Sequence, residues 1–421
     1  MRFGIRFVLR SSGFVYPSLV LPLDAIPFEP SRHESFLSSI PSVPGVFLIE
    51  THATASAAPH RPYLSRTADL RRAAERLLGI PDPTSKRLNL RDRANFFRFR
   101  VTGSRFEQLV VLYEQSRTRI PSAYRQFLRL RPPAMLKINL RNSYPRCYVT
   151  RRLLDDAGFY VGPFASRQMA ENFAGRFLDL FKIRRCQIKI RRDPSFPGCI
   201  YSEMKMCLAP CFAGCSKEEY DAEVVQVADA LESQGASLVA AVEHEREAAS
   251  EATEFERAAA LHKRLEKISS VFRGMPEIIR RTEKLSAVIL QRAAREKTVA
   301  LFAVVDGVIA DPLFLSFGDM SQPRSAEEII REHFQQFSES PPRSDGHPCD
   351  TMNSGAPGSQ TDSQLPPDSA RREEHLWLLA RWFYSKPREG EILFREGGWP
   401  YRKMLRACAR VLAPQPAPEQ K

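Results

Sequence analysis

Four cysteines, Cys186, Cys199, Cys207 and Cys211, follow one another closely enough to close around one metal centre. Thiolates are soft ligands that suit a zinc ion or an iron–sulfur cluster. A single cysteine is more often a small buried hydrophobic residue, but four at this spacing predict metal or cluster binding. A zinc site formed by Cys199, Cys207, Cys211 and Cys215 is the alternative. The residues alone leave the choice of metal open.

Basic side chains surround these cysteines. The chain of 421 residues has a formal net charge of +13, which suits a polyanionic partner, although a solubilising surface charge is the plain alternative. Arginine predominates, and its planar guanidinium binds phosphate oxygens in pairs. We therefore predict phosphate contacts from five residues, with a solvated basic face as the alternative. These residues are Arg184, Arg185, Lys189, Arg191 and Arg192.

The elements that must position these residues indicate an α+β protein with a small mixed sheet and an antiparallel helical hairpin. Two apolar runs flank Asp306-Gly307, a pair typical of a β-hairpin turn. Residues rich in proline, serine and glycine predict a disordered linker near the C-terminus. The predicted segments are an N-terminal extension (1–39), an α/β domain (40–130), a loop-rich cysteine module (131–216), a helical region (217–273) with a hairpin at 240–270, a segment with a β-hairpin (274–336), the linker (337–372) and a C-terminal helical segment (373–421).

The N-terminal apolar run is interrupted by Arg6 and Arg10, and no cleavage site of a signal peptide follows it. No stretch approaches the roughly 18 apolar residues that span a bilayer. We therefore expect a cytoplasmic protein without a membrane partner. In a reducing compartment, clustered cysteines favour metal ligation over disulfides.

Two short motifs identify a family more specifically than the cysteines do. They are YVGPFAS at 160–166 and CIYSEMKMCLAPC at 199–211. They resemble the central segment of the UvrC family, the incision subunit of bacterial nucleotide excision repair. The resemblance implies a [4Fe–4S] cluster on Cys186, Cys199, Cys207 and Cys211.

The segment EATEFERAAALHKRLEKI at 251–268 resembles the UVR motif, the helical hairpin through which UvrC and UvrB pair. The resemblance implies a partner-binding surface, and an ordinary intramolecular hairpin is the alternative. The implied contact residues are Glu254, Phe255, Glu256, Ala258, Ala259, Leu261 and Leu265.

PGVFLIE at 44–50 and PYLSRTADLRRAAERLL at 62–78 stand in the order of a GIY-YIG nuclease domain. That chemistry needs a tyrosine pair, a basic residue after the second tyrosine, a helix arginine and a metal-binding glutamate. Tyr63 and Arg66 are the retained positions. The other positions are occupied by Phe47 for the first tyrosine, Ser65 for the glycine, Ala73 for the arginine and Leu112 for the glutamate.

The sequence therefore predicts a truncated UvrC-like protein that binds DNA and a UvrB-like partner and lacks its own incision activity. The resemblance ends where the second nuclease domain of the family would stand, and a divalent metal for cutting is not expected. One rival is a Cho-like single-incision endonuclease whose metal ligand has moved to Glu107 or Glu114. Another is a regulatory UVR adaptor that does not bind DNA.

Overall fold

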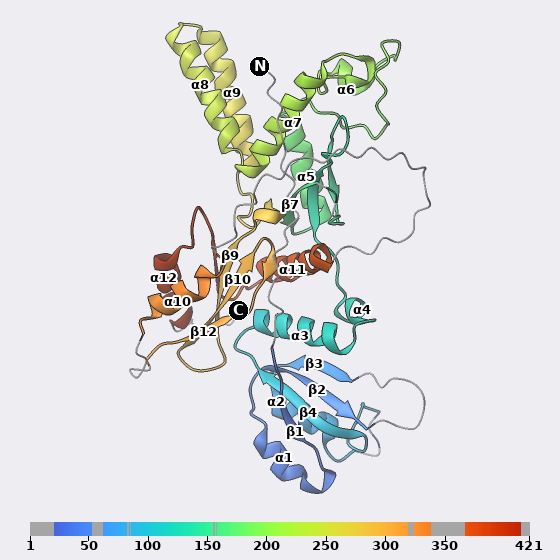
Figure 1. The fold of residues 1–421 in the computed structure, drawn as a ribbon, viewed down its shortest axis with the longest axis vertical. Helices are drawn as coiled ribbons and strands as arrows, with labels where there is room; N and C mark the ends of the chain where they lie inside the picture. The colour runs from blue at the N-terminus through green and yellow to red at the C-terminus, as the bar shows by residue number, and fades with distance from the viewer. Residues whose placement is uncertain are drawn as a thin grey trace, which may run out of the picture.

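The computed structural model describes residues 21–52, 62–81, 84, 86–154, 156, 158–318, 324–337 and 367–413. Over these residues the chain is elongated, with antiparallel sheets along its length and a helical hairpin that projects at one end (Figure 1). The fold is α+β, as the sequence predicts, but the predicted mixed sheet is wrong, because the strands of the N-terminal sheet all pair antiparallel. Residues 1–20 of the predicted extension and 338–366 of the predicted linker lie outside the described residues.

The N-terminal sheet is covered on both faces. Its strands pair in the order β1-β4-β2-β3. On β2, Val46 and Leu48 pack toward one helix, whereas Phe47 and Ile49 pack toward two others, because successive strand residues point to opposite faces. The strands are β1 (Asp24–Pro27), β2 (Gly45–Thr51), β3 (Tyr63–Thr67) and β4 (Ala94–Val101). The first face carries α3 (Arg105–Arg119), and the second carries α1 (His33–Ser39) and α2 (Leu70–Leu78).

Side-chain caps begin both long helices of this domain. Asp69 accepts from the Arg72 amide at the start of α2, and Ser104 accepts from the Glu107 amide at the start of α3. The domain also begins earlier than predicted. Because β1 pairs with β4 and α1 packs beside α2, residues 24–39 belong to the domain and not to a separate extension.

The middle sheet has the order β6-β5-β7-β8. Its strands are β5 (Ala134–Ile138), β6 (Cys147–Thr150), β7 (Phe159–Phe164) and β8 (Arg280–Arg281), with α4 (Tyr124–Leu128) before them. Helix α5 (Arg167–Leu178) begins after Ser166, as predicted, and covers the sheet with Phe173 and Phe177. The cysteine segment follows, with the short α6 (Ile200–Glu203), and leads into α7 (Lys217–Glu232).

An antiparallel hairpin of α8 (Ala236–Glu251) and α9 (Phe255–Phe272) stands out from the rest of the molecule (Figure 1). Four side chains of α9 are buried along the inner side of the hairpin and its base. They are Leu261, Leu265, Ile268 and Val271. The chain then returns as β8 to the edge of the middle sheet, so the hairpin is an excursion from that sheet.

The C-terminal sheet has the order β11-β10-β9-β13, with β12 also beside β10. Its strands are β9 (Ala287–Arg292), β10 (Thr298–Val305), β11 (Val308–Ile309), β12 (Leu313–Ser316) and β13 (Glu391–Phe394). The turn at Asp306-Gly307 joins β10 to β11, as predicted. One face packs on α10 (Ala326–Gln335) and α12 (Tyr401–Leu412), and the other packs on α11 (Pro367–Phe383).

Two predicted boundaries need correction here. Helix α11 begins at Pro367, within the range assigned to the linker. The C-terminal segment is not purely helical, because β13 pairs with β9. Trp377, Trp382 and Trp399 are buried in the cores. Among the described residues, we find no helix with the length and apolar character needed to cross a bilayer.

Candidate functional site

The cysteine module is a loop that curls back on itself. Cys199 lies at the start of α6, and Cys211 lies in a 3-10 turn (Pro210–Phe212). Lys205, Ala209 and Ala213 each have a positive φ, between 55° and 63°. Such strained backbone is characteristic of ligand clamps. The Ala209 amide donates to the sulfur of Cys207 over 3.3 Å, so one thiol already has a backbone donor.

The other three predicted ligands all act on Cys207. Burial is the main cause that raises the pKa of the Cys207 thiol to about 11, and Cys186, Cys199 and Cys211 contribute to this rise. The charges that act on Cys215 include Glu219 and Arg192 besides Cys211. Of the two predicted sets, the one with Cys186 is therefore the set whose other three thiols all act on Cys207.

Coordination itself needs a closer approach. In the described part of the chain, no three or more His, Cys, Asp or Glu side chains are arranged so that they could hold a metal ion. The donor chemistry suits a thiolate-bound centre, but the thiols would have to turn inward and lose their protons to bind it. All four are free thiols.

The predicted phosphate-binding residues divide into buried and exposed groups. Arg184 is buried, and its guanidinium donates to the carbonyl oxygens of Tyr144 (2.7 Å) and Ile188 (2.8 Å). Its prediction as a DNA contact is therefore wrong, because its donors hold the module together. Arg185 pairs with Asp179 over 2.9 Å. Lys189, Arg191 and Arg192 are exposed, and Arg192 also donates to the carbonyl of Cys215.

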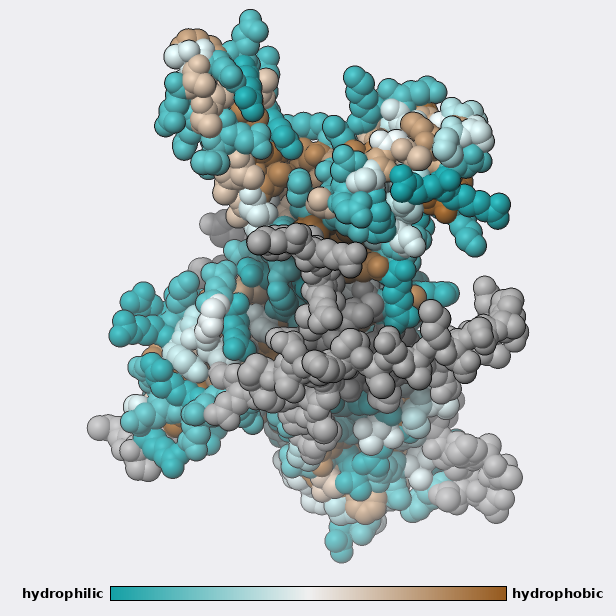
Figure 2. Space-filling view, turned by 45° about the horizontal axis from the view of Figure 1, so that its top comes forward, coloured by the Kyte–Doolittle hydropathy of each residue, from teal (hydrophilic) through white to brown (hydrophobic). Residues whose placement is uncertain are grey.

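The predicted partner-binding residues of the hairpin divide in the same way. Leu261 and Leu265 are buried, so their prediction as direct partner contacts is wrong: they join α9 to its own hairpin. Ala258 is half-buried against the same core. Phe255 is 70% exposed at the start of α9. Glu254, Glu256 and Ala259 are exposed beside it, and the exposed surface of the hairpin is largely hydrophilic (Figure 2).

The retained nuclease positions do not meet. Tyr63 lies beside Phe47 on the face of the sheet that carries α2, with ring centroids 6.0 Å apart. Arg66 is three residues further along β3 and therefore points to the other face. Ser65 lies opposite Phe47 on the adjacent strand. The structure thus separates the two remnant residues.

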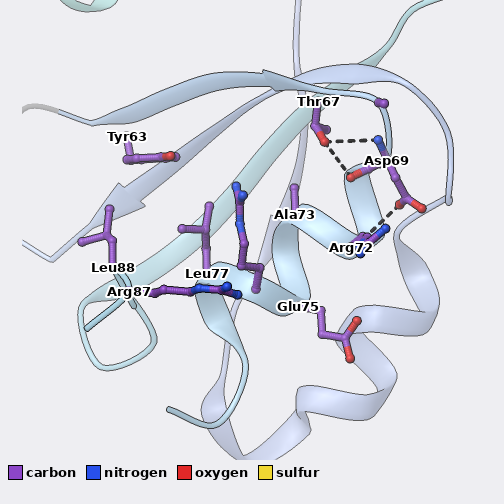
Figure 3. A pocket seen from close by; sticks show the side chains of 11 residues that line it. Tyr63, Thr67, Asp69, Arg72, Ala73, Glu75, Leu77, Arg87 and Leu88 are labelled. Atoms are coloured by element: carbon purple, nitrogen blue, oxygen red, sulfur yellow. Dashed lines mark hydrogen bonds between the residues drawn. The ribbon is translucent and has the colours of Figure 1, made fainter. Parts of the chain in front are cut away.

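A cleft of about 970 Å³ lies beside Tyr63 (Figure 3). Ala73, Arg72 and Arg76 of α2 line it, together with Arg87. Two acidic residues, Asp69 and Glu75, also line it. Asp69 caps α2 and accepts from Ser42, which lower the pKa of its carboxyl group, and Glu75 points away from Tyr63 (Figure 3).

Neither of the glutamates that could replace Leu112 lines this cleft. Glu107 is buried, accepts from the Gly103 amide and lies 3.8 Å from Arg100. Glu114 is buried near His375 of α11, 3.9 Å from its Nε2. Leu112 packs against the same core. The sequence predicts a helical segment over 373–421 but gives no signal that α11 packs on α3, because contacts over such a separation leave no local pattern.

The middle of the chain, residues 134–230, matches the family model described as "UvrC/Cho excinuclease, middle domain". This segment is similar to the middle domain of UvrC/Cho excinucleases. It comprises the middle sheet up to β7, α5, the cysteine module and most of α7. All four candidate cysteines fall inside it. The resemblance to the UvrC family is therefore confirmed for the segment that contains the two motifs at 160–166 and 199–211.

Three related proteins extend the similarity. The UvrABC system protein C of Carboxydothermus hydrogenoformans is 27% identical over 47% of this chain and 32% of its own length. That of Dehalococcoides mccartyi strain BAV1 is 26% identical over 72% of this chain and 49% of its own. That of Nitratidesulfovibrio vulgaris is 30% identical over 45% and 26%, respectively. The chain thus spans half or less of these relatives. No solved structure matches it.

Proposed function

We propose that this protein acts in nucleotide excision repair in the cytoplasm as a DNA- and UvrB-binding component that does not cut DNA itself. The observation that carries the proposal is the UvrC/Cho-type middle domain with four candidate ligand cysteines inside it. The relatives named above are C proteins of the UvrABC system. Since the chain matches only part of each, their activity and partners enter here as proposals.

Cys186, Cys199, Cys207 and Cys211 would bind a [4Fe–4S] cluster, which would tie the loop-rich module together. The influence of Cys186, Cys199 and Cys211 on Cys207 supports this set over the set with Cys215, and the amide donor to Cys207 suits a ligand thiolate in either set. Backbone N–H groups directed at sulfur stabilise ligated thiolates. Lys189, Arg191 and Arg192 remain available beside it for phosphate.

The hairpin would bind the UvrB-like partner through its exposed tip. Phe255 is a large aromatic side chain that little of the protein covers. Aromatic anchors of this kind dominate binding energy when a partner buries them, and charged neighbours select the partner. Glu254 and Glu256 supply those charges, whereas Leu261 and Leu265 keep the two helices together.

The absence of incision activity is supported by the cleft beside Tyr63. Phe47 has no hydroxyl to orient a water molecule, and Arg66 points to the opposite face. The acidic side chains that line the cleft cap a helix or point away. A metal ion that neutralises developing charge on the phosphate would find no carboxylate pair here.

One preparation tests the proposal. The anaerobically purified protein is analysed for iron, sulfide and zinc, and then assayed for duplex binding, UvrB capture and nicking of damaged duplex with magnesium or manganese. We expect iron and sulfide, binding to both partners and no nicking. Metal-dependent nicking that Glu107→Gln or Glu114→Gln abolishes would establish the Cho-like rival, and UvrB capture without DNA binding would establish the adaptor.

A further inference from the structure

A second cleft lies where α11 meets the middle sheet. Its volume is about 300 Å³, and it is lined by β5, by the turn from β7 into α5 and by the C-terminal half of α11. Figure 1 shows α11 between the middle sheet and α3. Three arginines from separate parts of the chain reach this cleft. They are Arg131, Arg151 and Arg381.

The charges in this cleft are all of one sign. None of the described residues that line it is acidic. Among the residues that the structure describes, none accepts a hydrogen bond from the side chain of Arg131, Arg151 or Arg381. Burial and the neighbouring charge of Arg66 lower the pKa of the Arg381 guanidinium. Gathered, uncompensated cations repel one another, so this arrangement favours an anion.

Two further features of the cleft favour phosphate as its ligand. The guanidinium of Arg381 lies over the ring of Trp377, 5.1 Å from its centroid, which restrains it without using its N–H donors. Ser166 and the first turn of α5 form part of the lining, and that turn contains no acidic residue. The positive end of the helix dipole therefore adds to the arginine charges.

We propose that this cleft binds the phosphodiester backbone of a nucleic-acid strand, with Arg131, Arg151 and Arg381 as the phosphate-binding residues. Trp377 is a positioning residue, because it is buried and offers no free ring face on which a base could stack. The cleft is too small for a folded partner and suits one phosphate with its adjoining sugars. The inference rests on the proposed DNA binding and assigns a surface for it away from the cysteine module.

The test measures binding of a labelled eight-nucleotide oligothymidylate to the full chain over a range of salt concentrations. Each lost phosphate contact should lower the slope of log K against log salt by about 0.7 for a single strand. We expect Arg151→Gln and Arg381→Gln each to weaken binding roughly three- to tenfold at low salt and to reduce the slope by about that amount. Arg406→Gln on α12, also exposed and of equal charge change, should alter neither.

The outcomes separate this site from the broader proposal. Unchanged affinity and slope in the double variant Arg151→Gln/Arg381→Gln would overturn the cleft while DNA binding stood. If the wild-type protein bound no strand, the DNA part of the proposed function would fail. Inorganic phosphate would then decide the cleft: a rise in thermal midpoint that the double variant loses supports a free-phosphate site, and no rise overturns the inference.

Discussion

Replacing Glu114 by glutamine should stabilise the protein at neutral pH. The residue is 6% exposed, and its Oε1 has no hydrogen-bond partner among the described residues. Burial, with Asp311 and Glu374 acting in the same direction and Arg371 and Arg117 against it, raises the pKa of its carboxyl group to about 6. His375 lies 3.9 Å away and is itself held neutral by burial, which lowers its pKa.

The sign and size follow from proton linkage. A carboxyl group whose pKa is higher in the folded state is easier to bury protonated, so its contribution to stability falls as pH rises from the unfolded value of 4.5 through about 6. The difference between the two pKa values corresponds to a loss of about 2 kcal/mol in the free energy of unfolding above pH 7. Glu114→Gln removes the charge and keeps the shape, so it should recover up to about 2 kcal/mol at pH 7.5 and about 1 kcal/mol or less at pH 5.

The assay is thermal unfolding of the wild-type protein, Glu114→Gln and Glu256→Gln at pH 5.0 and 7.5. Glu256 is exposed on the hairpin, so its variant controls for the loss of one negative charge. The midpoint of Glu114→Gln should exceed that of the wild type mainly at pH 7.5. An equal shift at both pH values, or a loss of stability at pH 7.5, would refute the reasoning by showing that the ionised carboxylate is well compensated.

Three further predictions concern single side chains. Tyr113→Phe removes a buried 2.6 Å hydrogen bond to a carboxylate and should lower the thermal midpoint by the equivalent of about 1.5–3 kcal/mol. Cys207→Ser should remove the visible absorption of an anaerobic preparation, while Cys215→Ser keeps it; a colourless wild-type preparation whose bound zinc is lost in Cys215→Ser would favour the zinc alternative. Phe255→Glu should abolish UvrB capture without altering the thermal midpoint of unfolding. Leu265→Ala should instead lower the stability of the hairpin by about 2–5 kcal/mol, measured by circular dichroism. Capture that survives Phe255→Glu would exclude the tip from the interface.

Local patterns predicted many elements well. Ser104 and Ser166 before helical stretches, and Asp306-Gly307 between apolar runs, each encode a cap or turn within a few residues. Such signals need no knowledge of the rest of the chain. The segment boundaries fared worse, because β8 and β13 join sheets whose other strands lie far away in sequence.

The candidate sites show the same limit. Charge marked Arg184 as a phosphate contact, and the resemblance to the UVR motif marked Leu261 as a partner contact. A charged residue can instead satisfy buried carbonyls, and an apolar stripe can close on its own hairpin. Conversely, Arg131, Arg151 and Arg381 attract no notice in the sequence, since they come from three separate elements. Only the packing of α11 brings them together.

The position of α3 bears on the prediction that Leu112 stands where a GIY-YIG nuclease would have its glutamate. The ring centroid of Phe106 lies 5.0 Å from that of Phe302 of β10 and 5.2 Å from that of Trp382 of α11. Tyr113 of α3 donates to Glu374 of α11 within the same interface. Helix α3 thus joins the N-terminal sheet to the C-terminal sheet, and Leu112 belongs to that packing. A charged side chain at this half-buried position would be partly desolvated against the core, so Leu112→Glu should lower the thermal midpoint of unfolding.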